Sequence, residues 1–135
     1  MITLYKEADN KLLSVKNQDN ILDNVEKNMW IDVVNPSMAD IRKLSEKTGI
    51  ALELLSSALD EEESAHLDKD EEDTLIVLDV PYMEEPDSEN EKSYYATTPF
   101  VIAYNEDYLV TLCAKDTALI QLVLGKNKRI EPHKH

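Results

Sequence analysis

The stretch from Trp30 to Ser37 constrains the fold more than any other part of the chain, because it predicts a strand followed directly by a helix. Trp30–Val34 is rich in β-branched and aromatic residues, which favours a strand. Pro36 removes a backbone donor and keeps the residue before it out of the right-handed helical region. Ser37 is a good N-cap, and Asp40 stands three residues later, where the acid of a capping box belongs. This block alone does not predict a catalytic or binding site.

Periodicity and turn residues predict the other elements. We expect strands at Ile2–Glu7, Leu12–Lys16, Leu75–Val80, Phe100–Tyr104 and Tyr108–Ala114. We expect helices at Pro36–Thr48, Ala51–Asp60 and Thr117–Leu124, with Gly49 as a left-handed cap after the first. Asp9-Asn10 and Asn105–Asp107 read as hairpin turns, Gln18–Asn28 as a loop with one helical turn, and Glu84–Lys92 as an acidic loop.

Three of these segments carry a further prediction about burial. The second helix is expected to bury Leu52, Leu55 and Leu59. Leu75–Val80 is apolar on both faces apart from Asp79, which is typical of a central strand buried on two sides and ended by the next proline. The middle of the acidic tract 60–73, near residues 64–67, could pair as an edge strand.

Strands and helices that are interspersed without strict alternation favour the α/β class. We therefore expect a single domain with a mixed β-sheet flanked by helices, an α/β sandwich. The domain is expected to span residues 1–125, and residues 126–135 to form a polar tail that begins a truncated stalk region.

The charge balance excludes some partners. The chain has 28 acidic and 14 basic side chains, a formal net charge of −14. Such a surface repels phosphate backbones and anionic lipid headgroups, so we expect neither nucleic acid nor a peripheral membrane surface as a partner. It favours cations, although most acidic surfaces serve only to keep a domain solvated.

The remaining composition points to an intracellular domain. Cys113 is the sole cysteine, so no intrachain disulfide can form, which fits a reducing compartment. The first residues lack the pattern of a signal peptide, and no stretch approaches the roughly 18–20 apolar residues needed to cross a bilayer. With two glycines in the chain, there is no phosphate-cradling loop and no nucleotide fingerprint.

Three blocks together carry a family resemblance. They are Trp30-Ile-Asp-Val-Val-Asn-Pro36, Leu75-Ile-Val-Leu-Asp-Val-Pro-Tyr82 and Asp107-Tyr-Leu-Val-Thr-Leu112, with two helices between the first two that end in Ala58–Glu63. In this order and spacing the chain resembles the cytoplasmic N-terminal domain of CorA-like magnesium transporters. The resemblance runs from the first hairpin to Leu124.

The resemblance implies a regulatory role in a larger assembly. Full-length members continue into a long stalk helix and two membrane helices with a Gly-Met-Asn signature, none of which is present here. They form homopentamers around a divalent-cation pore, and magnesium between subunits holds the channel closed. The abrupt end at residues 131–135 suggests a cut, so a pentamer is expected only of the full-length protein, as is contact with the plasma or inner membrane.

The family's regulatory carboxylate aligns with Ser57, which cannot supply the charge. The next acids are Asp60, Glu61, Glu62 and Glu63, which we regard as the candidate ligands of a weak Mg²⁺ site. Magnesium takes oxygen ligands, keeps several waters and needs only one or two carboxylates. The alternative is a solvated helix end without a site, which is the usual role of such charge runs.

Other conspicuous residues have simpler interpretations. Asp68–Asp73 fails as an EF-hand loop, because the sixth position is Asp73 rather than glycine and the twelfth is Asp79, inside a strand. Cys113 is expected to be a buried structural thiol, Trp30 a core anchor and Asp79 solvent-facing. His66 is isolated, and His133 and His135 could bind metal only adventitiously.

These observations lead to two hypotheses of different classes. The first is a cytoplasmic, cation-sensing regulatory domain of a CorA-like divalent-cation transporter that lacks the pore. The second is a free-standing acidic α/β binding module without transport function. No side chains suggest a paired nucleophile and base, so we do not expect an enzyme.

Overall fold

The computed structural model describes residues 1–16, 20–84, 94–117, 119, 120, 122 and 124. These residues form one seven-stranded mixed sheet, which confirms the predicted fold class. The strands are β1 (Ile2–Ala8), β2 (Lys11–Lys16), β3 (Met29–Val34), β4 (His66–Asp70), β5 (Asp73–Glu84), β6 (Tyr94–Tyr104) and β7 (Tyr108–Cys113). Their order in the sheet is β2-β1-β3-β7-β6-β5-β4, with β3 and β7 parallel and the other neighbours antiparallel.

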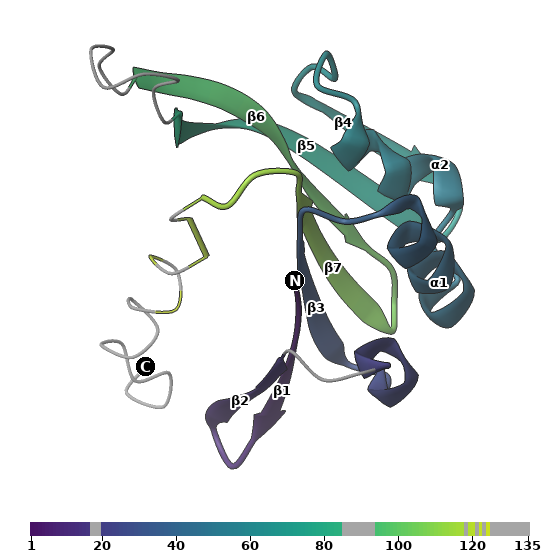
Figure 1. Cartoon of the computed structure of the whole chain (residues 1–135). Helices are drawn as coiled ribbons and strands as arrows, with labels where there is room; N and C mark the ends of the chain where they lie inside the picture. Colours follow the sequence, from purple (N-terminus) through teal and green to yellow (C-terminus); the bar gives the residue numbers. More distant parts are fainter. Residues whose placement is uncertain (17–19, 85–93, 118, 121, 123, 125–135) are drawn as a thin grey trace, which may run out of the picture.

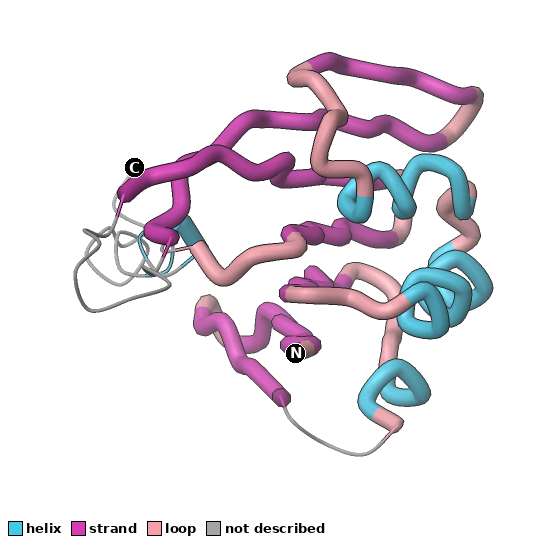
Figure 2. Tube along the Cα trace, turned by 45° about the horizontal axis from the view of Figure 1, so that its top comes forward, coloured by secondary structure: helices cyan, strands magenta, loops and turns pink. Residues whose placement is uncertain are grey.

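The helical elements lie along one side of the sheet (Figures 1 and 2). They are η1 (Ile21–Asn24), α1 (Met38–Thr48), α2 (Leu52–Leu55) and η2 (Ser56–Leu59), where η marks a 3-10 helix. The chain that follows β7 passes to the other side of the sheet (Figure 1). We call the side covered by these elements the helix face, and the opposite side the open face.

The helix predicted after Trp30–Val34 is confirmed together with its cap. Ser37 Oγ accepts a hydrogen bond from Asp40 N at 3.1 Å, and Asp40 Oδ2 accepts one from Ser37 N at 3.0 Å. Gly49 ends the helix with φ of 76°, the left-handed conformation that favours glycine. The helix begins at Met38 rather than Pro36, because Pro36 precedes the N-cap.

The second predicted helix is present but differs in its buried face. Only Leu52–Leu55 is α-helical, and Ser56–Leu59 continues as a 3-10 helix. Leu54, Leu55 and Ala58 face the core, whereas Leu52 and Leu59 are 38% and 37% exposed. The prediction for Leu52 and Leu59 was therefore wrong. The tighter winding of Ser56–Leu59 moves Leu59 away from the face of Leu55, and Leu52 lies at the first position of the helix.

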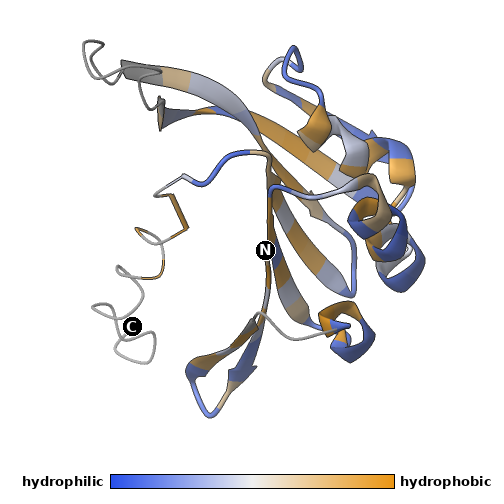
Figure 3. Ribbon diagram, viewed as in Figure 1, coloured by the Kyte–Doolittle hydropathy of each residue, from blue (hydrophilic) through white to orange (hydrophobic). Residues whose placement is uncertain are grey.

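The main core lies between the helix face and the helices. Its side chains come from β1, β3, β7, β6 and β5 on the sheet and from η1, α1, α2 and η2 above it. The largest side chains that are almost fully buried are Ile31, Ile41, Leu44, Ile50, Leu55, Leu75 and Leu112. Figure 3 shows the apolar residues alternating with polar ones along β3 and β7, while the outer surface of α1 is hydrophilic.

Strand β5 corrects the prediction of a strand buried on both sides. Leu75 and Val77, on the helix face, are each 1% exposed, but Leu78, on the open face, is 41% exposed. The reason is that helices cover only one face of the sheet. Asp79 is exposed, as predicted. The strand also runs through Pro81, which a sheet tolerates here because β4 pairs with β5 only as far as Val77.

Most other local predictions are confirmed. The hairpins β1–β2 and β6–β7 form as expected, and the edge strand in the acidic tract is His66–Asp70. Strand β6 begins at Tyr94, earlier than the predicted Phe100. Of the predicted helix Thr117–Leu124, residues 119, 120, 122 and 124 are helical. Of the predicted acidic loop Glu84–Lys92, Glu84 ends β5 and residues 85–92 lie outside the described residues, as does the tail 126–135 with His133 and His135.

Candidate functional site

The acids predicted to bind a cation follow η2 and form a turn before β4. The backbone of Asp60 is extended. Asp60 Oδ1 accepts a hydrogen bond from Glu62 N at 3.0 Å, and the Asp60 carbonyl accepts one from Glu63 N at 3.0 Å. Asp60, Glu61 and Glu62 are exposed, and Glu63 is half-buried. The local sequence therefore favours a solvated turn that leaves most of these carboxylate oxygens in contact with water.

Two side chains, His66 and Ser57, lie next to this turn in the sequence. Glu63 Oε1 lies 3.4 Å from His66 Nδ1, which also makes a 2.6 Å hydrogen bond to the Ser64 carbonyl. The sequence predicted an isolated His66, but the structure places it in contact with Glu63. The Ser57 hydroxyl, at the position of the expected regulatory carboxylate, makes a long 3.5 Å hydrogen bond to the Glu53 carbonyl. Ser57 is half-buried in η2, one turn before Asp60.

The structure does not bring these acids together as a ready ligand set. Within the described part of the chain, no three or more His, Cys, Asp or Glu side chains are grouped so that they could hold a metal ion. Magnesium is usually bound by one or two protein carboxylates, and water or other groups complete its coordination. The magnesium site at Asp60–Glu63 stays a prediction.

A buried carboxylate that the sequence did not single out lies on the open face. Asp32 on β3 is 7% exposed, and its Oδ1 accepts a 2.8 Å hydrogen bond from Thr111 Oγ1 on the neighbouring strand β7. The same hydroxyl accepts a 2.8 Å hydrogen bond from Trp30 Nε1. Trp30 also stacks on Tyr5 with ring centroids 4.4 Å apart. These four side chains, which we call the Asp32 cluster, come from three adjacent strands.

Burial determines the electrostatics of the Asp32 cluster. It raises the pKa of Asp32, and the nearby Asp116 adds to that effect. The Thr111 hydrogen bond and the amino terminus act in the opposite direction and lower this pKa. Burial also raises the pKa of Tyr5, with a contribution from the Asp32 charge. The cluster thus joins a buried carboxylate, a hydroxyl and two stacked aromatic rings.

The alternation of side chains along β3 could have indicated on which face of the sheet Asp32 lies. Ile31 and Val33 are fully buried on the helix face, so Asp32 had to point to the open face. The sequence led us instead to Asp79 as the unusual acid, and Asp79 is exposed. The prediction that Trp30 anchors the core was also wrong, because Trp30 is half-buried on the open face. Cys113 is confirmed as a buried thiol, 3% exposed, and burial raises its pKa.

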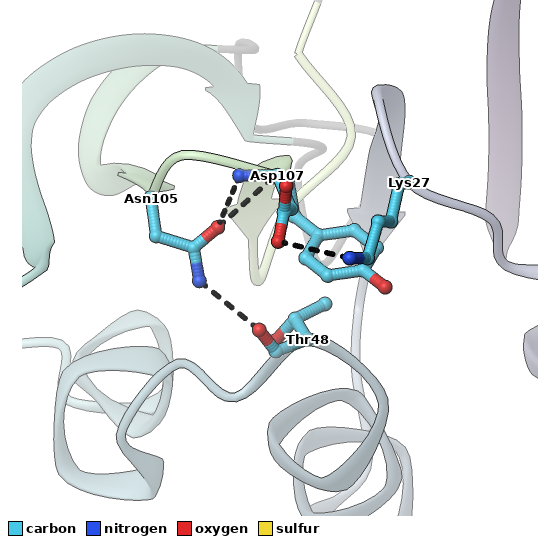
Figure 4. A network of polar contacts seen from close by, with 5 residues as sticks. Lys27, Thr48, Asn105 and Asp107 are labelled. Atoms are coloured by element: carbon cyan, nitrogen blue, oxygen red, sulfur yellow. Dashed lines mark hydrogen bonds and ion pairs between the residues drawn. The ribbon is translucent and has the colours of Figure 1, made fainter.

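A third polar network joins α1 to the β6–β7 turn (Figure 4). Asn105 Nδ2 donates to the Thr48 carbonyl at 3.0 Å, while Asn105 Oδ1 accepts from Asp107 N at 3.0 Å and Tyr108 N at 2.9 Å. Lys27 Nζ lies 3.8 Å from Asp107 Oδ2, an exposed ion pair of the kind that contributes little to stability. Because Asn105 satisfies backbone groups on both elements, we assign this network to the fold.

Comparison with known proteins gives a consistent result. The family model described as CorA-like Mg2+ transporter protein matches residues 25–134. The cobalt/magnesium transport protein CorA of Methanocaldococcus jannaschii is 28% identical over 102 residues, which are 76% of this chain and 31% of that protein. No helix in the described residues is long and apolar enough to cross a membrane.

Two solved structures are similar to the fold. The soluble domain of CorA from Methanocaldococcus jannaschii has a TM-score of 0.67 and 24% identity, covering 98% of this chain and 48% of that one. The complete CorA magnesium transporter from the same organism has a TM-score of 0.62 and 23% identity, covering 96% and 38%. The chain thus spans less than half the length of these relatives, and at these identities the structures establish the fold alone.

Proposed function

We propose that this chain, which belongs to the CorA-like Mg2+ transporter family, is the cytoplasmic, cation-sensing regulatory part of a divalent-cation transporter. The observation that carries the proposal is the family match over residues 25–134, which includes all three sequence blocks of the resemblance. The family is one of transporters and not of enzymes. The pore, the membrane helices and a homopentameric assembly belong to the proposal for the longer protein.

The ligand in this proposal is Mg²⁺ or a similar hard dication, which binds weakly at Asp60–Glu63. These acids are exposed and follow the last turn of a helix, where the partial negative charge of the peptide carbonyls disfavours additional acids by about 0.3–1 kcal/mol. A dication would relieve that repulsion. With few protein ligands the ion keeps most of its water, so the affinity in this chain should be about millimolar or weaker.

A magnesium titration followed by backbone NMR tests the binding site. We expect shifts centred on residues 60–63, and a variant with Asp60→Asn, Glu61→Gln and Glu62→Gln should lose them. The matched control neutralises Asp68, Asp70 and Glu72, which are also exposed acids and belong to the next hairpin, and it should keep these shifts. Shifts confined to other regions, or micromolar affinity, would contradict the proposed site.

The Ser57 position allows a second test of the regulatory role. Ser57→Asp restores the carboxylate of the family pattern, and in the 135-residue chain it should change magnesium affinity little. In the same chain extended by its natural downstream sequence, the substitution should tighten binding, because other subunits then complete the coordination. Equal effects in both forms would argue against an intersubunit site.

The alternative function is a free-standing acidic α/β binding module. The two functions differ in what the reading frame encodes beyond His135. A long charged helix, two apolar stretches and a Gly-Met-Asn motif would support the transporter. A stop codon at that point would support the free-standing module.

A further inference from the structure

Strand β2 forms an open edge of the sheet (Figure 1). In the part of the chain that the structure describes, β2 pairs with β1 on one side and is the last strand of the sheet on the other. Its sequence is Lys-Leu-Leu-Ser-Val-Lys, and Leu12, Leu13 and Val15 are 43%, 54% and 41% exposed. An exposed apolar edge strand offers unpaired backbone groups and apolar side chains to another strand.

The other edges of the described sheet carry features that prevent such pairing. Strand β4, at the opposite end, has Asp68, Lys69 and Asp70. Strands β5 and β6 extend beyond their pairing with β4 and β7, and those parts contain Pro81 and Pro99. Charged side chains and proline are the usual means by which an edge strand is kept from pairing. The centre of β2 has neither, so its edge is left able to pair.

The turn before β2 determines which of its backbone groups point outward. Asp9-Asn10 is a two-residue turn with positive φ at both positions, 52° and 64°, as a type I′ hairpin requires. In such a hairpin the residues that flank the turn, here Ala8 and Lys11, exchange both hydrogen bonds, and the pattern alternates along the strands. Leu12 and Ser14 therefore direct their N–H and C=O groups away from β1.

The side chains of β2 extend the apolar surface of the helix face. Val15 is opposite Leu4 of β1, which belongs to the main core, so Val15 and Leu13 lie on the helix face. Leu4 is buried, whereas Val15 and Leu13 remain in contact with water. The main core thus ends at β1 and leaves two apolar side chains uncovered beside it.

The charge of β2 makes a second copy of the chain a suitable partner. The formal net charge is −14, so two copies repel each other over most of their surface. The sequence of β2 contains two lysines and no acid. Two copies can therefore approach each other at β2 with less repulsion than at β4, which contains two aspartates.

Twofold symmetry and the alternation of hydrogen bonds leave few registers for two copies of β2. With Ser14 opposite Ser14 of the second copy, the outward peptide groups of the two strands bond to each other. Each Leu13 is then opposite Val15 of the second copy, in the pair type that brings side chains closest. Centring the contact on Leu13 would instead place each Val15 opposite Lys11. The first register covers both apolar side chains and opposes no two lysines.

We propose that β2 is a self-association edge, at which β2 of a second copy pairs antiparallel in this register and continues the sheet. The contact is isologous, because both copies use the same strand. It involves the 6 residues of β2 in each copy, against about 20–30 in a standard interface, so the dimer is weak. Added salt strengthens it, since salt screens the net repulsion between the copies.

Amide hydrogen exchange at two protein concentrations tests the pairing. Between about 10 µM and about 1 mM, exchange at Leu12 and Ser14 should slow about two- to fourfold, as a dissociation constant in the high micromolar range gives. Leu13 and Val15 bond to β1 in both states and should change little. Fast exchange at both concentrations would mean an unpaired edge, and slow exchange at both would mean that a segment of the same chain covers it. Either result overturns the proposal.

Cross-linking tests the register. Opposed residues of a hydrogen-bonded antiparallel pair have Cα atoms about 5.5 Å apart, which a disulfide spans, so Ser14→Cys should form a covalent dimer under mild oxidation. Lys11→Cys is the matched control on the same strand. The two copies of residue 11 lie about 20 Å apart in this register and should cross-link at least about tenfold more slowly. The native Cys113 is 3% exposed and does not compete. Equal rates would overturn the proposal, because random collisions would then explain both products.

A charge at the contact should abolish the association and leave the fold intact. Val15→Lys places a lysine opposite Leu13 of the second copy, at an exposed position, and circular dichroism verifies the fold. Leu67→Lys, at an exposed leucine of β4, is the control on the other edge and should still associate. Light scattering at the higher concentration measures both. A dimer that persists in Val15→Lys would overturn the proposal, and so would association that weakens with salt, because β2 would then pair with the acidic β4.

Discussion

The two faces of the sheet are built from the same strands but differ in what covers them. The helix face packs against η1, α1, α2 and η2, and its central side chains are almost completely buried. The open face has a small core under Leu119 and Ile120, a buried carboxylate in the Asp32 cluster, and several exposed apolar side chains. The helix face thus supplies most of the packing energy, and the open face holds the buried carboxylate of the Asp32 cluster.

The largest expected effect is a cavity on the helix face. Leu55→Ala removes a side chain that is fully buried, so it should lower the free energy of unfolding by about 2–5 kcal/mol. Leu78→Ala, on the open face of β5, should cost about 1 kcal/mol or less, because Leu78 is 41% exposed. Urea denaturation of both variants measures the difference. Equal losses would mean that the open face is as well packed as the helix face.

The second effect concerns the hydroxyl that links Trp30 and Asp32. Thr111→Val removes the acceptor of the Trp30 Nε1 hydrogen bond and the donor to Asp32, and should cost about 1–3 kcal/mol. The Trp30 emission should change with it. Thr111→Ser keeps the hydroxyl and serves as the control.

A matched substitution on the helix face separates stability from the Trp30 signal. Thr48→Val also removes a buried hydroxyl, which donates to the Leu44 carbonyl at 2.7 Å. It should destabilise the fold by a similar amount without changing Trp30 emission. An emission change in Thr48→Val would show that Trp30 reports on global loosening rather than on the Asp32 cluster.

A smaller effect is expected in the reactivity of Cys113. Burial raises the pKa of this thiol, so the reactive thiolate is scarce at neutral pH and labelling by a thiol reagent should be slow. Leu119→Ala with Ile120→Ala uncovers the open face and should speed labelling in the folded protein. Leu52→Ala, an exposed position beside the helix face, should leave the rate unchanged. Fast labelling of the unmodified chain would mean that Leu119 and Ile120 do not cover the thiol.

The smallest effect comes from an exposed ion pair beside the helix face. Lys43 Nζ lies 2.9 Å from Asp23 Oδ1, and its hydrogen bond and charge lower the pKa of Asp23. The folded state therefore binds fewer protons at Asp23 than the unfolded state does. The stabilisation is present above the ordinary pKa of an aspartate and is lost as the pH falls through the lowered value.

Lys43→Gln should thus lower stability slightly near neutral pH and have no effect in strong acid. Added salt should reduce the difference at neutral pH as well, because both groups are substantially exposed. Urea titrations at two pH values and two salt concentrations check this. A difference that persists in strong acid would have to come from lost packing of the lysine stem instead.

The sequence by itself determined the local elements and the family. The capping box at Ser37 and Asp40, the left-handed Gly49 and the turn at Asn105 depend on residues within a few positions of one another, so they could be predicted. The mixed α/β sheet followed from the order of these elements, and the family from three blocks of sequence. Of the candidate site, the sequence could place the acids at the end of the second helix.

Only the tertiary structure decided which side of each strand is covered. Alternation assigns Asp32 and Ile31 to opposite faces, but it does not say which face receives the helices, because those come from distant parts of the chain. Asp32 is nevertheless buried on the open face, where it bonds to Thr111, whereas Asp79 is exposed although alternation places it on the same side of the sheet as Leu75 and Val77. Burial, and with it the raised pKa of Asp32, results from long-range packing that no local pattern encodes.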